Sequence, residues 1–417
     1  PTQIIPGNIT FYPIRITDNL LHKSVELFTE HLPERLSEEL LIEGNILLKD
    51  TDMDIQLDDP IDAGTRWRWW DKRPLADMVR RLDTVDELFS LRVDGKRLRD
   101  RIYGIRLARE SLRVRDTYMH RIYANVTINL SHVVSKLIWN LASAGKTEID
   151  RGSFHRMLFL AIKNIQKNPQ VNLHRSLCTP PGYHGVIDGT CRGFIQFLAT
   201  ATAAGVITET DDTYRFLPKL LGDQEFDEVR VENPVLVYVN ETEPISVLQK
   251  AVVRAIKASP KVDDETLSRL LFEEEIATYH WEKKFFSLQQ YREINDQETA
   301  TESGEPYLLI PEKPNCLGVV LVHGFLASPA ELRAFGEQLY TAGHPVIGVR
   351  LKGHGTSPWD LRGRRWQDWL ESVRQGYRII TAFSEQVCLV GFSTGGTLSL
   401  LLAAEHPPRL AGVVAVS

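Results

Sequence analysis

A serine between small residues stands in the chemically most suggestive stretch of the chain. Gly391-Phe392-Ser393-Thr394-Gly395 matches the pattern G-x-S-x-G and lies between a predicted buried strand and a predicted helix. The glycines at both ends permit a turn so tight that a side chain there would strike the neighbouring strand or helix. Such a turn exposes the Ser393 hydroxyl as a nucleophile. It also leaves the N–H of Thr394, in the first turn of the helix, available to an oxyanion.

A histidine-glycine turn lies one strand earlier in the chain. Residues 317–322 read as a buried strand, and His323-Gly324-Phe325 follows it directly. We expect the N–H of Phe325 to be the second oxyanion donor, while Gly324 lets the backbone approach closely. We interpret His323 as a structural residue.

A further histidine, His354, stands in the turn Gly353-His354-Gly355-Thr356-Ser357. It could be mistaken for a catalytic base. A histidine flanked by glycines on such a turn more often ties loops together through hydrogen bonds, and we favour that structural role.

A serine nucleophile needs a histidine base and a carboxylate that orients the histidine. With this motif the chain order is serine, acid, histidine. Only 417 − 393 = 24 residues follow Ser393, and the one histidine among them is His406. His406 would lie about 18 Å along the helix from Ser393, at roughly 1.5 Å per residue. We therefore expect both partners beyond Ser417, and we expect this chain to be a fragment that is inactive by itself.

Strands and helices alternate through residues 311–417, where these motifs lie. Short β-branched runs separated by helical stretches predict a parallel sheet covered by helices. The expected fold class is therefore a doubly wound α/β domain. We expect strands over residues 317–322, 345–350, 387–391 and 410–416, and helices over 329–342, 366–382 and 394–405.

The residues before this domain divide into three segments. Residues 1–65 look like the tail of another α/β domain, with strand-like runs at 4–16 and 40–48. Residues 66–294 are predicted to be a mainly helical module. Residues 295–310 are polar and acidic, which is typical of a linker.

The helical module begins with apolar residues at helical spacing, at positions 75, 78, 79 and 82. Further along, two predicted helices at 154–165 and 194–203 precede a strand-turn-strand pattern at 206–216. Two helices followed by a hairpin resemble a winged helix. We expect this winged-helix-like part to serve packing or dimerisation rather than DNA binding.

The composition of the chain excludes several classes of protein. The chain has 417 residues, 43% apolar and 25% charged, which is typical of two or three globular domains. A net charge of −6 gives no general attraction to nucleic acid. No apolar run is long enough to span a bilayer, and four scattered cysteines favour a reducing compartment. We expect a cytoplasmic protein without metal or other cofactor.

One segment has the composition of a membrane interface. Residues 66–73, RWRWWDKR, mix cations with indole rings as interfacial segments do. Tryptophans also fill domain cores and domain interfaces, so both interpretations stay open. The first would place the protein peripherally at the inner face of the membrane.

Residues 317–417 resemble bacterial carboxylesterases and monoacylglycerol lipases, which are α/β-hydrolases. Five blocks occur in the order and spacing of that family: VLVHGFLASPAELR (320–333), RLKGHGTSPWDL (350–361), WQDWLESV (366–373), GFSTGGTLSLLLAAEHP (391–407) and AGVVAVS (411–417). The resemblance implies the N-terminal half of such a domain, without its acid, base and lid. It implies hydrolysis of a carboxylic ester with a lipid-like acyl group. The implied residues are Ser393 as nucleophile, Phe325 and Thr394 as oxyanion donors, and His323, Gly324, Gly391, Gly395 and His354 in support.

The N-terminal part resembles the region that follows the catalytic motifs of glycerol-3-phosphate-type acyltransferases. The resemblance is carried by IIPGNITFYPIRI (4–16), NLHRSL (172–177) and ENPVLVY (232–238). The H-x-x-x-x-D acyl-transfer motif of that family does not occur, since His184 and Asp188 are one residue too close. A helical regulatory module of unrelated origin is the alternative.

Together these patterns predict a lipid-metabolic fusion, in which an acyltransferase-like part is joined to a serine hydrolase of carboxylic esters. In a second interpretation the hydrolase part is non-catalytic and acts as a scaffold in a protein related to glycerophospholipid acyltransferases. In a third, the hydrolase is a thioesterase that acts on acyl carriers.

Overall fold

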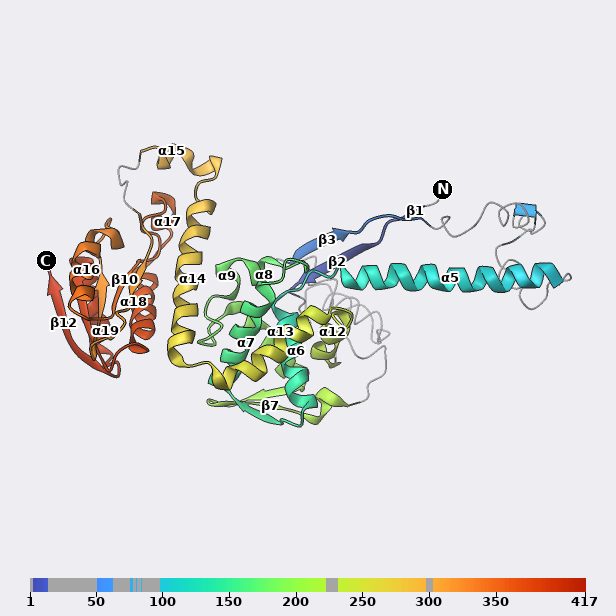
Figure 1. The fold of residues 1–417 in the computed structure, drawn as a ribbon, viewed down its shortest axis with the longest axis horizontal. Coiled ribbons are helices and arrows are strands. Elements are labelled where there is room, and N and C mark those ends of the chain that lie inside the picture. The colour runs from blue at the N-terminus through green and yellow to red at the C-terminus, as the bar shows by residue number, and fades with distance from the viewer. Residues whose placement is uncertain are drawn as a thin grey trace, which may run out of the picture. The chain divides into compact units, whose positions relative to one another are not determined.

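The structure is a computed structural model, and it describes residues 3–13, 51–62, 76–77, 80, 84, 98–222, 232–297 and 303–417. Three sequence expectations fall outside these residues: the strand-like run at 40–48, the tryptophan-rich segment at 66–73, and the apolar positions 75, 78, 79 and 82. The chain forms two compact units, one of Pro1–Cys178 with Gly182–Ser259 and one of Thr179–Pro181 with Pro260–Ser417 (Figure 1).

The first unit contains the winged-helix-like part that the sequence predicts. Its elements in chain order are α6 (Leu130–Ser143), β5 (Glu148–Asp150), α7 (Arg151–Gln166), α10 (Arg192–Ala203), β6 (Ile207–Glu209) and β7 (Thr213–Phe216). The three strands form an antiparallel sheet in the order β5-β7-β6, and the helices pack against one another and against the sheet. The predicted hairpin at 206–216 is therefore β6 and β7.

Local interactions explain why these elements form. Asp150 caps α7, because its carboxylate accepts two amide N–H groups of the first helical turn at 2.9 and 3.0 Å. Aromatic rings fill the space between the helices and the hairpin. The ring centroid of Phe154 lies 5.9 Å from that of Phe194 and 5.2 Å from that of Tyr214. Packing of this kind accounts for the stability of the short hairpin.

Further helices complete the first unit. α12 packs against α6, and α13 packs against both α6 and α7. The bounds are α5 (Leu98–Ala124), α8 (Arg175–Cys178), α9 (Pro180–Tyr183), η1 (Pro218–Leu221), α12 (Pro234–Glu241) and α13 (Ser246–Ala258).

The strand-like run expected at 4–16 is described as far as residue 13, and there it forms two strands. It is interrupted at Pro6, which has no N–H to donate to a ladder. The described residues on either side form two antiparallel pairs: β1 (Gln3–Ile4) with β4 (Ile61–Asp62), and β2 (Gly7–Tyr12) with β3 (Asp52–Leu57).

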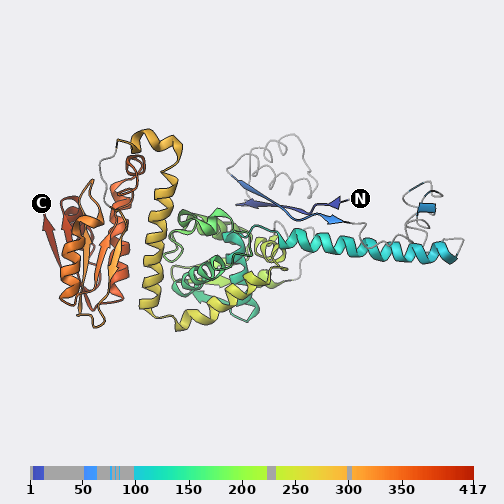
Figure 2. The same ribbon diagram turned by 45° about the horizontal axis from the view of Figure 1, so that its top comes forward.

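The second unit is an α/β domain with a five-stranded sheet in the order β12-β11-β9-β10-β8. β9 to β12 are mutually parallel, as the sequence predicts, and β8 is antiparallel to β10. Figures 1 and 2 show helices lying along this sheet. The bounds are β8 (Tyr307–Leu309), β9 (Leu317–Val322), η4 (Pro329–Leu332), α16 (Arg333–Thr341), β10 (Val346–Val349), α17 (Pro358–Arg362), α18 (Trp366–Thr381), β11 (Gln386–Phe392), α19 (Thr394–Ala404) and β12 (Leu410–Val416).

The apolar runs of β9 and β10 form strands because their side chains are buried on both faces. Val319, Val320, Leu321 and Val322 of β9, the central strand, are each at most 4% exposed. α18 is strongly amphipathic and buries Val373, Ile379 and Ile380. A parallel sheet covered in this way presents the carboxyl ends of its strands at one edge, where loops carry function.

The segment 295–310 contains more structure than a linker would. Residues 307–309 form β8, and Tyr307 is buried against β10. A Cβ at Gly348 would lie 2.2 Å from the Tyr307 ring, so only glycine leaves room for that ring. The ring therefore packs directly on the backbone of β10, which fixes β8 at the edge of the sheet.

The division between the two units falls near residue 260 and not at the expected linker. α14 (Asp264–Phe285) belongs to the second unit and packs against α18, and η3 (Gln289–Tyr291) and α15 (Arg292–Asn295) follow it. Tyr279 and Glu282 of α14 are buried in the unit. Among the described residues, no helix combines the length and the hydropathy that a membrane span requires.

Candidate active site

Ser393 lies in a sharp turn between β11 and α19. Its backbone has φ 52° and ψ −117°, a conformation that a residue with a side chain rarely adopts. The side chain is exposed. Two neighbouring glycines make the turn possible, because a Cβ at Gly391 would lie 2.2 Å from the carbonyl oxygen of Gly395. A Cβ at Gly395 would lie 2.2 Å from the carbonyl oxygen of Val322.

The turn is held by backbone hydrogen bonds on both sides. The N–H of Ser393 donates to the carbonyl of Val416 at 2.6 Å, which ties it to the end of β12. The carbonyl of Ser393 accepts the N–H of Thr397 at 3.2 Å, as α19 begins. Thr394 is the first residue of α19, where the N–H has no partner within the helix. The amide of Thr394 thus directly follows Ser393, in the first turn of the helix.

The loop after β9 lies directly beside this turn. A Cβ at Gly324 would lie 3.4 Å from the Cβ of Ser393 and 3.4 Å from the ring of Phe392. The structure thus brings the His323-Gly324-Phe325 loop and Ser393 together. Phe325, Leu326 and Phe392 are 51, 69 and 44% exposed, so the two segments that meet at this contact both carry exposed apolar side chains.

His323 is buried and links two loops. Its Nδ1–H donates to the carbonyl of Gly324 at 2.8 Å, and its Nε2 accepts the N–H of Leu351 at 3.2 Å. Burial lowers the pKa of His323 to about 3, so the ring is neutral and keeps one donor and one acceptor. These contacts join the loop after β9 to the loop after β10.

His354 is buried beside His323 and next to Phe325. Its ring centroid lies 5.0 Å from that of His323, 5.9 Å from that of Phe325 and 5.4 Å from that of Trp369. Its Nδ1 lies 3.2 Å from the carbonyl oxygen of Leu351. Burial lowers its pKa. Its contacts are therefore with the loop after β10 and with aromatic rings, which is the packing expected of a structural histidine.

His406 lies away from the turn. It follows the C-terminal end of α19, whereas Ser393 precedes the N-terminal end of the same helix. The two residues are therefore separated by the length of the helix, as the sequence predicts. Among the described residues, no group of His, Cys, Asp and Glu side chains has the arrangement of a metal site.

Three side chains near the candidate site were not singled out by the sequence. Trp369 donates its Nε1–H to the carbonyl of Lys352 at 3.0 Å and packs against Phe325 at 5.7 Å between ring centroids. Arg350 and Glu282 form a buried ion pair beside the same loop. Trp366 and Trp369 stand at helical spacing in the sequence. That spacing predicts packing for Trp369 and gives no indication of a place beside the site.

The first unit holds another Ser-His-Asp arrangement. Ser176 Oγ lies 2.9 Å from Nδ1 of His174, and Nε2 of that histidine lies 3.0 Å from Oδ2 of Asp52. Both Ser176 and His174 are 4% exposed. Ser176 Oγ also accepts the N–H of Leu130, the first residue of α6, at 3.0 Å. A hydroxyl so buried and engaged is a clamp between β3 and α6 and not a reactive group.

Comparison with known proteins finds likeness in the second unit. A family model described as serine aminopeptidase, S33, matches residues 314–417. A thermostable monoacylglycerol lipase from Bacillus sp. (strain H-257) is 41% identical over 101 residues, which are 24% of this chain and 40% of that protein. A carboxylesterase from Bacillus subtilis (strain 168) is 32% identical over 90 residues, 21% of this chain and 37% of that protein. The chain thus spans about two fifths of the length of these relatives.

Solved structures give the same kind of neighbour with low global scores. A structure from a study of LipS and LipT, two metagenome-derived lipolytic enzymes, has 30% identity and a TM-score of 0.26, and the match covers 27% of this chain and 45% of that one. The alpha/beta hydrolase domain-containing protein 10 from mouse has 23% identity and a TM-score of 0.22, covering 28% of this chain and 47% of that one.

The family match and the strand order together confirm the fold expected for the C-terminal part. Residues 314–417 match the serine aminopeptidase, S33, model and are similar to the two bacterial relatives; they fold as four parallel strands with covering helices, and β8, which precedes residue 314, adds an antiparallel edge. The preceding region is mainly helical, as predicted. The family match does not extend to the N-terminal part, where the acyltransferase resemblance stays a prediction.

Proposed function

We propose that the second unit is the N-terminal half of a serine hydrolase domain that cleaves carboxylic esters with an apolar acyl group. The observation that carries the proposal is the strained, exposed position of Ser393 beside the loop of Gly324 and Phe325. A nucleophile must be accessible and must stand next to preorganised donors. The names of the two bacterial relatives, a monoacylglycerol lipase and a carboxylesterase, support the same activity.

The proposed reaction assigns a role to each residue of the turn. Oγ of Ser393 attacks the ester carbonyl carbon, and its proton passes to a base that we expect outside residues 314–417. The carbonyl oxygen becomes an oxyanion that accepts hydrogen bonds from the N–H groups of Phe325 and Thr394. The C–O bond to the alcohol breaks, the alcohol leaves with the proton, and water then hydrolyses the acyl-serine.

The apolar surroundings of the serine support a lipid-like substrate. Phe325, Leu326 and Phe392 expose large apolar side chains next to Ser393. Apolar surface of this kind gains free energy when it is covered by an acyl chain, at about 25 cal/mol per Å². We infer from it a preference for acyl esters over peptides, although the family model carries the name of an aminopeptidase.

Labelling with a fluorophosphonate probe tests the proposal. In the full-length protein, labelling should occur at Ser393 and be lost in Ser393→Ala. Ser384→Ala is a matched control, because Ser384 precedes β11 while Ser393 follows it. Labelling that persists in Ser393→Ala, or that is absent from the full-length protein, would contradict the proposal and favour the scaffold interpretation.

A comparison of p-nitrophenyl esters with acyl-CoA as substrates separates the ester hydrolase from the thioesterase.

The wider predictions rest on sequence patterns: the fusion with an acyltransferase-like part, the role in lipid metabolism, the cytoplasmic location and the peripheral membrane contact. They stay predictions beside this proposal, because the observations that support it concern Ser393 and its neighbours alone.

A further inference from the structure

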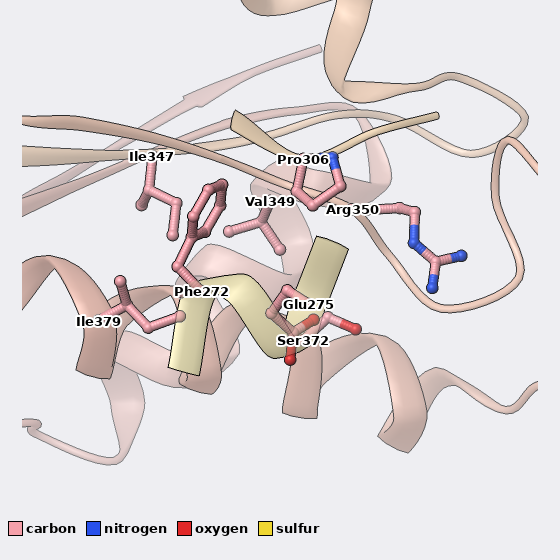
Figure 3. A pocket seen from close by; sticks show the side chains of 9 residues that line it. Phe272, Glu275, Pro306, Ile347, Val349, Arg350, Ser372 and Ile379 are labelled. Atoms are coloured by element: carbon pink, nitrogen blue, oxygen red, sulfur yellow. The ribbon is translucent and has the colours of Figure 1, made fainter. Parts of the chain in front are cut away.

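α14 lies outside the family match and is nevertheless built into the second unit. Phe272 extends from it toward Ile347 and Val349 of β10, and Glu275 lies beside Ser372 of α18, around a small cavity (Figure 3). The residues matched by the family model begin at 314, after α14 has ended. The helix thus precedes the matched segment in the chain and packs against it.

The polar end of this contact is a buried charge cluster around Glu282. The two carboxylate oxygens bind different arginines: Oε2 lies 2.5 Å from Nη2 of Arg350, and Oε1 lies 2.7 Å from Nη2 of Arg364. Arg364 also pairs with Asp360 at 2.6 Å. The side chains of Glu282, Arg350 and Asp360 are 4, 2 and 1% exposed. Arg364 is 26% exposed, so the cluster is buried at Glu282, Arg350 and Asp360 and reaches the surface at Arg364.

Arg350 connects the charge cluster around Glu282 to the loop after β10. Its Nη1 donates to the carbonyl of His354 at 3.3 Å, and its guanidinium lies over the ring of Tyr279 of α14 at 5.5 Å from the centroid. A second hydrogen bond holds the other end of this loop, because Ser357 Oγ donates to Oδ1 of Asn295 of α15 at 2.5 Å. The loop from 350 to 357 is thus held at both ends by residues that precede the family match.

The same loop contacts the proposed oxyanion loop twice. The N–H of Leu351 donates to His323, which in turn donates to the carbonyl of Gly324. The His354 ring packs edge-on against Phe325. A shift of the 350–357 loop would therefore move the peptide unit whose N–H is proposed to bind the oxyanion.

We propose that Glu282 is a positioning residue for the proposed ester-hydrolase site. By fixing Arg350 and with it the loop after β10, Glu282 fixes the direction of the Phe325 N–H through His323 and His354. This inference rests on the proposed function of Ser393. A buried pair is held in one geometry because loss of either partner leaves an uncompensated charge, so it is suited to this task.

The variant Glu282→Gln keeps the shape of the side chain and removes the charge. In the full-length protein we expect kcat for a p-nitrophenyl ester to fall by about tenfold with KM within about twofold, as for loss of an interaction that acts in the transition state. Binding of a trifluoromethyl ketone, whose adduct with serine carries an oxyanion, should weaken by about the same factor. Arg350→Lys should act in the same direction, because one ammonium cannot reproduce the fork of the guanidinium.

Leu271→Ala is the matched control. Leu271 is buried on α14 about three turns before Glu282, so its truncation loosens the helix without touching the charge cluster. It should lower the melting temperature by at least as much as Glu282→Gln and leave kcat and ketone binding close to the wild-type values. Equal losses of kcat in the two variants, or wild-type kinetics in Glu282→Gln, would overturn the inference.

Hydrogen exchange separates failure of this inference from failure of the proposed function. Glu282→Gln should raise amide exchange at Leu351 and in the peptide that contains residues 323–327, whether or not the protein hydrolyses esters. Raised exchange in a protein without any Ser393-dependent activity would leave the coupling in place and reject the ester hydrolase. Unchanged exchange would reject the coupling even in an active enzyme.

Discussion

Gly395 approaches Val322 so closely that a Cβ on the glycine would lie 2.2 Å from the carbonyl oxygen of the valine. Gly395 lies in the first turn of α19 and Val322 ends β9, so the contact joins the turn that carries Ser393 to the strand that leads into the Gly324 loop. The distance between nucleophile and proposed oxyanion loop is therefore set by backbone atoms and not by flexible side chains.

We predict that Gly395→Ala disrupts the site. The added methyl group must push α19 away from β9, at a cost of about 2 to 4 kcal/mol, because backbone atoms cannot move aside as side chains do. Unfolding in urea should show this loss, and fluorophosphonate labelling of Ser393 should fall at least tenfold.

Gly412→Ala provides the control for this prediction. Gly412 lies in β12, and a Cβ there would meet nothing within 4 Å. We expect a change in stability within about 0.5 kcal/mol and unchanged labelling. A Gly395→Ala protein with wild-type labelling would show that the tight contact is not what places Ser393.

The second prediction concerns stability at low pH and rests on His323. Its pKa is about 3 in the folded protein because the ring is buried, against about 6.5 in an unfolded chain. Between these two pKa values the unfolded chain binds more protons than the folded one. The free energy of unfolding is therefore unaffected by this residue above about pH 6.5, and it falls as the pH drops toward 3. The expected slope from this one residue is about 1.4 kcal/mol per pH unit.

Urea unfolding at several pH values between 3 and 7 measures this slope. In His323→Asn the slope should be smaller by about that amount, although the variant is less stable at pH 7 because the N–H of Leu351 loses its acceptor. His406→Asn, at an exposed position, serves as the control. Equal slopes in wild type and His323→Asn would mean that the ring is not protonated on unfolding as proposed.

The sequence was sufficient for the parallel strands because each is encoded locally. Runs such as the one at 317–322 are apolar at every position, which fits only a strand buried on both faces. The G-x-S-x-G pattern was equally local, since steric exclusion requires glycine at 391 and 395 whatever the rest of the chain does. The positions of the parallel strands and of the serine turn follow from such signals.

Contacts between distant residues could not be predicted in the same way. Glu282 and Arg350 are 68 positions apart, and neither has a neighbour in sequence that indicates a buried partner. The sequence therefore predicts that α14 belongs to the preceding helical module. β8 is only three residues long, and its burial depends on the space that Gly348 leaves for Tyr307, so no periodic pattern marks it within the polar segment.

The third prediction separates the buried Ser176 from the proposed nucleophile. Because Ser176 Oγ accepts the N–H of Leu130 in a buried place, Ser176→Ala should cost about 1 to 3 kcal/mol of stability in the first unit. Fluorophosphonate labelling of the full-length protein should not change. Residual labelling in Ser393→Ala that disappears when Ser176 is also replaced would identify a second nucleophile and contradict the clamp interpretation.

The last prediction concerns the acyl group. Leu326 is 69% exposed beside the proposed oxyanion loop, so Leu326→Asp should fold normally but place a charge where an acyl chain would lie. We expect kcat/KM for a p-nitrophenyl decanoate to fall by about tenfold or more, and that for the acetate by less than about threefold, because the acetate covers little apolar surface.

A similar change far from the serine provides the comparison. Ile195 is 50% exposed on α10, and Ile195→Asp should leave both values unchanged. The informative quantity is the ratio of the two kcat/KM values, since a general loss of active protein lowers both equally and cancels. If the ratio in Leu326→Asp stays at the wild-type value, acyl chains do not bind over the exposed apolar side chains near Ser393. The substrate would then have to be recognised by its alcohol portion.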